Sequence, residues 1–289
     1  MKSKLLIVAI LYLVLNSCTK EKISIDFLKS NSDLPEVVVH GGVLSVHGRQ
    51  FVRLSVPKST MKGDSFIPIS NAHITLTDGE KYYSYQESEI AGEYYTIDSI
   101  LLSAGKEYTL NIEINGKKYF AKDEMKFCDY HGVLPINEIT FDETGRVYTK
   151  SYIHNFGFSD NNMWILNHHF DSTGNPYEYL SPKTIIDYPI ILFTHNSVLP
   201  QGLFANKTVC TGGAGEPEQF EEYIKLSVSD NYYKYLISLF NLTDWSSGLF
   251  STIPGNTYTN FSDGATGYFF ASDVKKIRVQ FKDLTALSK

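Results

Sequence analysis

Apolar and polar residues alternate along most of the chain between residues 35 and 126. The run "QFVRLSV" places Val52, Leu54 and Val56 on one side of a strand and their neighbours on the other, which is the period of a half-buried β-strand. Similar runs are "EVVVHGGVL", "AHITLTDGEKYYSYQ", "GEYYTIDSI", "EYTLNIEI" and "KKYFAKDEM". About seven short strands at this spacing favour an immunoglobulin-like or prealbumin-like β-sandwich over residues 35–126.

Two dipeptides between alternating runs predict hairpins. Asp78-Gly79 and Asn115-Gly116 each separate two such runs. A type I′ turn needs positive φ at both central residues, and these residue types favour it.

The pattern is less regular over residues 127–289. Further strand candidates include "GRVYTKSYIHNFGF", "NNMWILNHHF", "EEYIKLSV" and "VKKIRVQF". In "SVSDNYYKYLISLFNL", apolar residues recur at i, i+4, i+7 and i+8 from Tyr232, and Ser229 or Asp230 can cap the first amides. We expect a second β-rich domain carrying one amphipathic helix.

The first 34 residues follow neither pattern. Lys2 and Lys4 precede an apolar run from Leu5 to Leu15, and about eleven apolar residues are too few for a helix to cross ~30 Å of hydrocarbon. We therefore expect a cleaved export signal over residues 1–17. Residues 18–34 are mixed and polar, which predicts a tether.

Leu15-Asn16-Ser17-Cys18 resembles the bacterial lipobox, in which the cysteine becomes the first mature residue. This resemblance implies diacylglycerol on Cys18, usually with an added N-acyl chain such as palmitate. Several acyl chains at ~0.8 kcal/mol per buried methylene give a stable membrane anchor; the alternative is a plain secretory signal with a chance cysteine. Thr19, rather than Asp, follows Cys18, which favours the outer membrane without deciding between its periplasmic and exterior faces.

The amino-acid composition favours strands and argues against a nucleic-acid partner. The chain has 43% hydrophobic and 20% charged residues, and its 20 Tyr and 18 Phe favour strands. Its formal net charge is -6. Since no basic stripe supplies attraction for phosphates, we expect no nucleic-acid partner.

Two further cysteines, Cys128 and Cys210, remain beside Cys18. In an oxidising compartment they can form a disulfide, or they can stay two separate buried thiols, and the sequence leaves both alternatives open.

No motif of catalysis or metal binding stands out. The chain has no Gly-x-Ser-x-Gly, His-Glu-x-x-His or EF-hand pattern, so we expect neither an enzyme nor a bound metal or cofactor. "TGGAGEP" lacks the Gly-Lys-Ser/Thr of a phosphate-binding loop and is interpreted as a flexible loop. A hydrolase site assembled from scattered residues leaves no motif and stays an alternative.

Aromatic residues near turn signals are the candidates for ligand contact. Tyr177, Tyr179 and Trp245 lie in such surroundings, and exposed aromatic faces stack on sugars or on partner proteins. The alternative for each is an ordinary structural role.

Several blocks together resemble a known family. They are "VVVHGGVLSVHGRQFVRLSV", "NAHITLTDGEKYYSYQE", "AGKEYTLNIEINGKKYFAKDEM" and "NFSDGATGYFFAS", and they are similar to the exported lipoproteins grouped as domain of unknown function 4249. The resemblance implies an outer-membrane lipoprotein that works beside a TonB-dependent transporter and helps to capture or pass on its cargo. It implies no catalytic residues.

The expected function is therefore that of a lipid-anchored, non-catalytic accessory or ligand-capture partner of such a transporter, with an unknown small ligand. A surface hydrolase and a purely structural or adhesive module are the alternatives.

Overall fold

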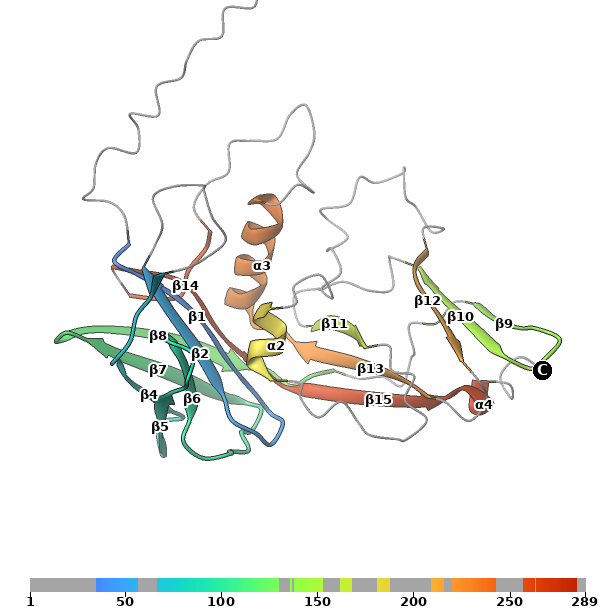
Figure 1. Cartoon of the computed structure of the whole chain (residues 1–289), viewed down its shortest axis with the longest axis horizontal. Helices are drawn as coiled ribbons and strands as arrows, with labels where there is room; N and C mark the ends of the chain where they lie inside the picture. The colour runs from blue at the N-terminus through green and yellow to red at the C-terminus, as the bar shows by residue number, and fades with distance from the viewer. Residues whose placement is uncertain are drawn as a thin grey trace, which may run out of the picture. The chain divides into compact units, whose positions relative to one another are not determined.

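A computed structural model describes residues 35–56, 67–129, 136, 138–152, 162–167, 181–187, 209–215, 220–242, 257–262 and 264–284 (Figure 1). The predicted signal segment and tether lie outside these residues, as do Tyr177, Tyr179 and Trp245. Pro35–Lys289 form one compact unit, which begins where the predicted tether ends.

The described elements are mostly strands. The strands are β1 (Val37–Leu44), β2 (Phe51–Val56), β3 (Ile67–Pro68), β4 (His73–Thr77), β5 (Tyr82–Glu87), β6 (Glu93–Thr96), β7 (Lys106–Ile114), β8 (Lys117–Met125), β9 (Glu138–Phe141), β10 (Val147–Tyr152), β11 (Asn162–Asn167), β12 (Val209–Gly215), β13 (Phe220–Ser227), β14 (Ala265–Ser272) and β15 (Val274–Gln280). The helices are α2 (Pro182–Asp187), α3 (Asp230–Leu242) and α4 (Phe281–Leu284). The predicted mostly β fold with an amphipathic helix is confirmed.

Within the described residues, nine strands form one sheet in the order β14-β1-β2-β6-β5-β4-β7-β8, with β3 added to β2. The two ends of this order meet, because the bridges Lys126↔Ser272 and Ala121↔Phe261 connect the β8 side to β14 and to the segment before it. The result is one nearly closed sheet, and the expected sandwich of two facing sheets is not confirmed.

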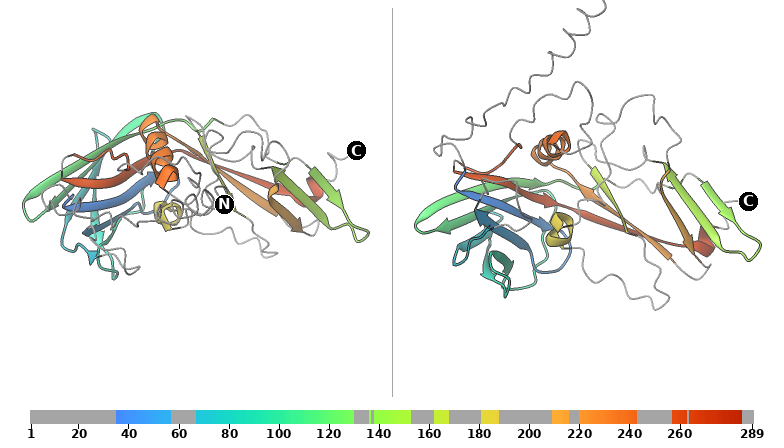
Figure 2. Two further views of the ribbon diagram at one scale, coloured as in Figure 1. Left: turned by 90° about the horizontal axis from the view of Figure 1, so that it is seen from above. Right: turned by 45° about the horizontal axis from the view of Figure 1, so that its top comes forward.

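The β14 strand joins this sheet from the far end of the chain. It pairs in parallel with β1, Val37 opposite Ala265 and Leu44 opposite Ser272 (Figures 1 and 2). The nine-stranded sheet therefore contains one strand from beyond the predicted boundary at residue 126. A C-terminal strand completes the sheet that the N-terminal strands begin.

Two glycines allow β1 and β14 to lie close to their neighbours. Gly267 has φ +97°, and a Cβ there would lie 1.9 Å from the carbonyl oxygen of Val39. A Cβ on Gly42 would lie 2.3 Å from the ring of Phe270. Any larger residue at these positions must therefore displace its neighbour.

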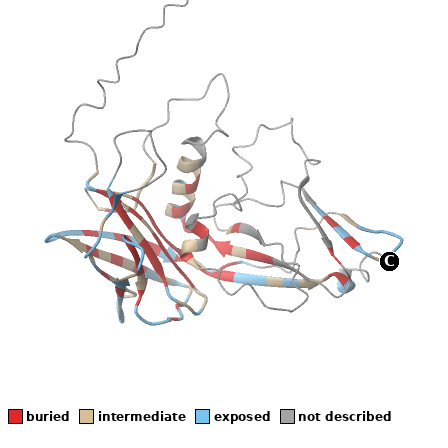
Figure 3. Cartoon of the chain, in the orientation of Figure 1, coloured by how far each residue is buried: buried red, intermediate tan, exposed pale blue. Residues whose placement is uncertain are grey.

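The β1 and β14 strands are buried on both faces (Figure 3). On one face Val39 and Phe269 belong to a core that fills the inside of the curved sheet. On the other face Tyr268 and Phe270 pack in a second core with residues of β13 and α3. Burial on both faces is typical of strands in parallel pairing.

The predicted hairpins differ in detail. Asn115 (φ 51°) and Gly116 (φ 79°) both have positive φ, as the type I′ turn requires. In the β4–β5 connection Gly79 has positive φ and Asp78 does not. Instead, Asp78 Oδ1 accepts hydrogen bonds from the amides of Glu80 and Lys81. That loop is therefore organised around the Asp78 carboxylate.

Two sheets of three strands, in the orders β12-β10-β9 and β11-β13-β15, make up the remaining described strands. Residues 211–215 belong to β12, so the prediction of a flexible loop there was wrong. Their pairing with β10 satisfies the backbone groups that a glycine-rich segment would otherwise expose.

Candidate functional site

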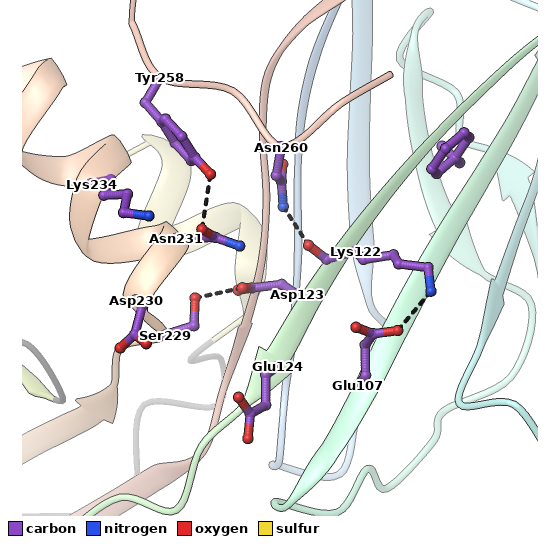
Figure 4. A pocket seen from close by; sticks show the side chains of 11 residues that line it. Glu107, Lys122, Asp123, Glu124, Ser229, Asp230, Asn231, Lys234, Tyr258 and Asn260 are labelled. Atoms are coloured by element: carbon purple, nitrogen blue, oxygen red, sulfur yellow. Dashed lines mark hydrogen bonds and ion pairs between the residues drawn. The ribbon is translucent and has the colours of Figure 1, made fainter. Parts of the chain in front are cut away.

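A cavity of about 560 Å³ opens between the β7–β8 hairpin, the start of α3 and the segment that precedes β14 (Figure 4). Its lining is mostly polar and consists of Glu107, Phe120, Lys122, Asp123, Glu124, Ser229, Asp230, Asn231, Lys234, Tyr258 and Asn260. The volume lies within the usual range of small-molecule sites.

The two faces of β8 have different roles. Phe120, Lys122 and Glu124 are exposed on the outer face, whereas Ala121 and Asp123 are buried on the inner face. The alternation of a strand thus gives the cavity an accessible wall. It also places one carboxyl group at a core position.

Asp123 is 2% exposed and connects three parts of the fold. Its Oδ1 accepts the hydroxyls of Ser229 at 2.5 Å and Tyr268 at 3.3 Å, and its Oδ2 accepts the amide of Ala271 at 2.8 Å. Burial raises the pKa of the Asp123 carboxyl to about 7, because the loss of solvation outweighs these hydrogen bonds and that from the Glu124 amide. Near neutral pH this carboxyl can therefore gain or lose its proton.

Of the two candidates for the cap, Ser229 and Asp230, Ser229 is the N-cap of α3. Its Oγ accepts the Tyr232 amide at 3.0 Å while its hydroxyl donates to Asp123, so one side chain satisfies a free helix amide and fixes the helix to β8. Aromatic rings secure the same helix to β14. The Tyr232 ring lies 5.3 Å from that of Tyr268 and 5.0 Å from that of Phe270.

Asn260 holds the remaining wall of the cavity in place. Its side chain donates to the carbonyls of Lys122 and Phe269 at 2.9 and 2.7 Å and accepts the Phe269 amide at 3.1 Å. The amide group thus substitutes for a strand partner between β8 and β14. Within the family-like block "NFSDGATGYF", this is the role of the first residue.

The charges that line the cavity are partly paired. Lys122 Nζ lies 2.8 Å from Glu107 Oε1, and Asp230 Oδ1 lies 2.5 Å from Nζ of Lys126. The Lys234 ammonium lies 5.7 Å from the centre of the Tyr258 ring, a favourable cation–π distance. These pairs leave little free positive charge in the lining.

Asn231 contributes donors to the cavity. Its Oδ1 accepts the Tyr258 hydroxyl at 2.8 Å, whereas its Nδ2 has no protein acceptor among the residues that the structure describes. Figure 4 shows this nitrogen pointing away from Tyr258. Two N–H groups are therefore free to bind a ligand.

Two features that would indicate other functions are absent from the described part of the chain. It contains no group of three or more His, Cys, Asp or Glu side chains that could hold a metal ion. It also contains no helix that is long and apolar enough to cross a membrane.

Few of the predicted site residues can be placed. Cys18, Tyr177, Tyr179 and Trp245 lie outside the described residues. Cys128 is a free, buried thiol in the structure, and burial raises its pKa to about 11. The side chain of Cys210 is not described, so its pairing with Cys128 stays a prediction.

The cavity itself was missed from the sequence. Its outer-face residues look like ordinary strand surface, and only their meeting with α3 makes them a site. One signal was available. In the β8 alternation Tyr119, Ala121, Asp123, Met125, a carboxyl occupies a core position, and such a residue needs buried partners.

The curved sheet, the capped helix and the open cavity define a mostly β protein with a polar pocket on its outer surface. The model of the family described as domain of unknown function (DUF4249) matches residues 20–278, and the chain belongs to this family. The predicted membership of this family is confirmed. No curated protein matches the chain.

Proposed function

We propose that the protein is an outer-membrane lipoprotein that captures a small ligand in the cavity beside α3 and passes it to a TonB-dependent transporter. The observation that carries this proposal is the open polar cavity of about 560 Å³. Cavities of this size hold small molecules, and a module that only spaces a partner from the membrane does not need one.

The sequence supports the proposed position at the outer membrane. Cys18 ends a lipobox-like segment, and Pro35, the first residue of the compact unit, follows 17 positions later (35 minus 18). A linker of this length spans at most roughly 60 Å when extended. The body can therefore reach a neighbouring membrane protein while its lipid stays in the bilayer.

The contacts of Ser229 favour binding over hydrolysis at this cavity. Ser229 is 3% exposed, and its hydroxyl group is engaged by both Asp123 and the Tyr232 amide. A serine nucleophile needs an accessible oxygen and a base that takes its proton. Here the same atoms hold a helix end in place.

Copurification tests the partnership. The tagged full-length protein, extracted from its native membrane in a mild detergent, should copurify with a β-barrel transporter. Repeated recovery of the membrane-bound protein without any transporter would refute the partnership.

A Cys18→Ala variant tests the anchor separately. After export it should move from the membrane fraction to the soluble fraction, because several acyl chains are lost. A variant that stays in the membrane would contradict lipidation at Cys18.

A further inference from the structure

Phe120 forms an apolar platform within the polar lining of the cavity. It is 51% exposed although it lies on a fixed strand. Its amide donates to Ser262 Oγ at 3.1 Å and its carbonyl accepts the Ser262 amide at 2.9 Å. These bonds fix the backbone of Phe120, and an aromatic side chain with only two rotatable bonds offers its face to a ligand at a small entropic cost.

Other polar groups of the cavity lining can pair with ligand hydroxyls both as donors and as acceptors. Asn231 Nδ2 and the lysine ammoniums donate, while the exposed Glu124 carboxylate accepts and has no side-chain partner in the described part of the chain. A ligand hydroxyl both donates and accepts, so a chain of hydroxyls can use these neighbours together.

The charge of the lining disfavours anions. The lining holds four carboxyl groups, Glu107, Asp123, Glu124 and Asp230, and two lysines, Lys122 and Lys234. Lys122 is already paired with Glu107. A phosphate or carboxylate ligand would have to compete with this pair and would face the remaining acidic groups.

We propose that the cavity binds a neutral oligosaccharide, with one sugar ring stacked on Phe120 and the hydroxyls of neighbouring sugar units bound by Asn231 and Glu124. This inference rests on the proposed role of the cavity as the ligand site and specifies the chemical class of the ligand. The apolar C–H face of one pyranose covers the Phe120 ring, while hydroxyls of the neighbouring units meet the polar groups, because Glu124 lies four residues, or about 13 Å, further along β8.

Binding to a defined panel tests this class. The full-length protein, kept in a detergent without a sugar headgroup, is applied to an array that carries neutral α- and β-linked glucans, mannans and xylans, acidic oligogalacturonates, and basic and acidic peptides. We expect binding to at least one neutral glycan. Titration calorimetry with the corresponding soluble oligosaccharide then gives the affinity.

Two variants locate the site. Phe120→Ala should weaken binding by about tenfold or more through loss of stacking. Asn231→Asp keeps the acceptor for Tyr258 but removes both N–H donors, and should also weaken binding by about tenfold. The matched control is Phe141→Ala, which removes an exposed ring on β9 (39% exposed) and should leave the affinity unchanged. Circular dichroism verifies that each variant is folded.

Three outcomes would overturn the inference: binding of acidic glycans or peptides alone, no binding to anything on the array, or binding by Phe120→Ala that is as tight as that of the unaltered protein. These outcomes are distinct from failure of the transporter partnership. The Phe120→Ala variant should still copurify with the transporter, because the anchor and the rest of the surface are unchanged.

Discussion

Replacing Asp123 with asparagine should abolish a pH dependence of stability that originates in one buried carboxyl group. The Asp123 pKa is raised from 3.8 to about 7, mainly by desolvation. This difference corresponds to on the order of 4 kcal/mol, which is a large part of the 5–15 kcal/mol that stabilise an ordinary domain.

The direction of the effect follows from proton binding. Below a pH of about 4 the carboxyl is protonated in the folded and the unfolded protein, and its full stabilising contribution is present. Between about pH 4 and pH 7 the unfolded chain loses this proton while the folded protein keeps it, so stability falls as the pH rises. Above about pH 7 both states are ionised and the contribution is constant.

Asparagine reproduces the protonated form. Its Nδ2 can donate to Ser229 Oγ, and its oxygen can accept the Ala271 amide that now donates to the carboxylate. The variant should therefore fold as well as the unaltered protein at acidic pH. It should not lose stability at the Asp123 site as the pH rises.

Urea unfolding of both proteins at pH 4.5 and pH 8 measures this effect. The stability of the unaltered protein relative to Asp123→Asn should fall by about 3 kcal/mol between the two pH values. Subtracting the unfolding free energy of the variant from that of the unaltered protein removes the contributions of all other titrating groups. Equal differences at both pH values would refute the argument that desolvation dominates at Asp123.

A control carboxyl in a different setting should respond differently. Asp142 lies in an exposed turn, and its pKa is lowered, chiefly by the hydroxyl of Thr144, which donates to it. Its ionised form is thus the favoured one, so Asp142→Asn should be less stable than the unaltered protein above about pH 4, and this difference should shrink as the pH falls below 4. The sign is opposite to that at Asp123.

Three further changes test other parts of the structure. In urea unfolding, Gly267→Ala should destabilise the protein by about 3 kcal/mol or more. The control Gly48→Ala, whose added Cβ would have nothing within 4 Å, should change stability by less than about 1 kcal/mol. Similar losses in the two variants would contradict the close packing of Gly267 against Val39. The free, buried Cys128 thiol should react slowly with a maleimide in the folded protein and rapidly in urea; rapid labelling of Cys128 in the folded protein would contradict its burial. Asp78→Asn should destabilise the β4–β5 loop above pH 4 but not near pH 2, because the hydrogen bond from Lys106 lowers the Asp78 pKa to about 2. Thermal melts of both proteins at the two pH values measure this difference. An equal loss of stability at both pH values would argue against it.

The strands β4, β7 and β8 were predictable because each of them buries one face. Alternation then records the burial directly, as in β8. The α3 helix was predictable for a similar reason, since its apolar stripe and the Ser229 cap are both local signals.

The β14 strand carries no such signal. Its sequence "ATGYFFAS" is buried along both faces, so period-2 alternation disappears. Its partner β1 is also remote in sequence. No local pattern could show that the sheet is completed by this strand, and the same fact hid the cavity, whose walls come from three separate segments.

The pairing of β1 with β14 sets the order in which the protein can be completed. The bond from the Ser45 hydroxyl to Asp273 Oδ1 joins residues 228 positions apart, and contacts of such long range form slowly. A chain that crosses a membrane unfolded and amino end first cannot close its sheet until residue 273 has followed. For the exported lipoprotein that we propose, closure of the sheet would therefore have to wait until almost the whole chain has crossed the membrane.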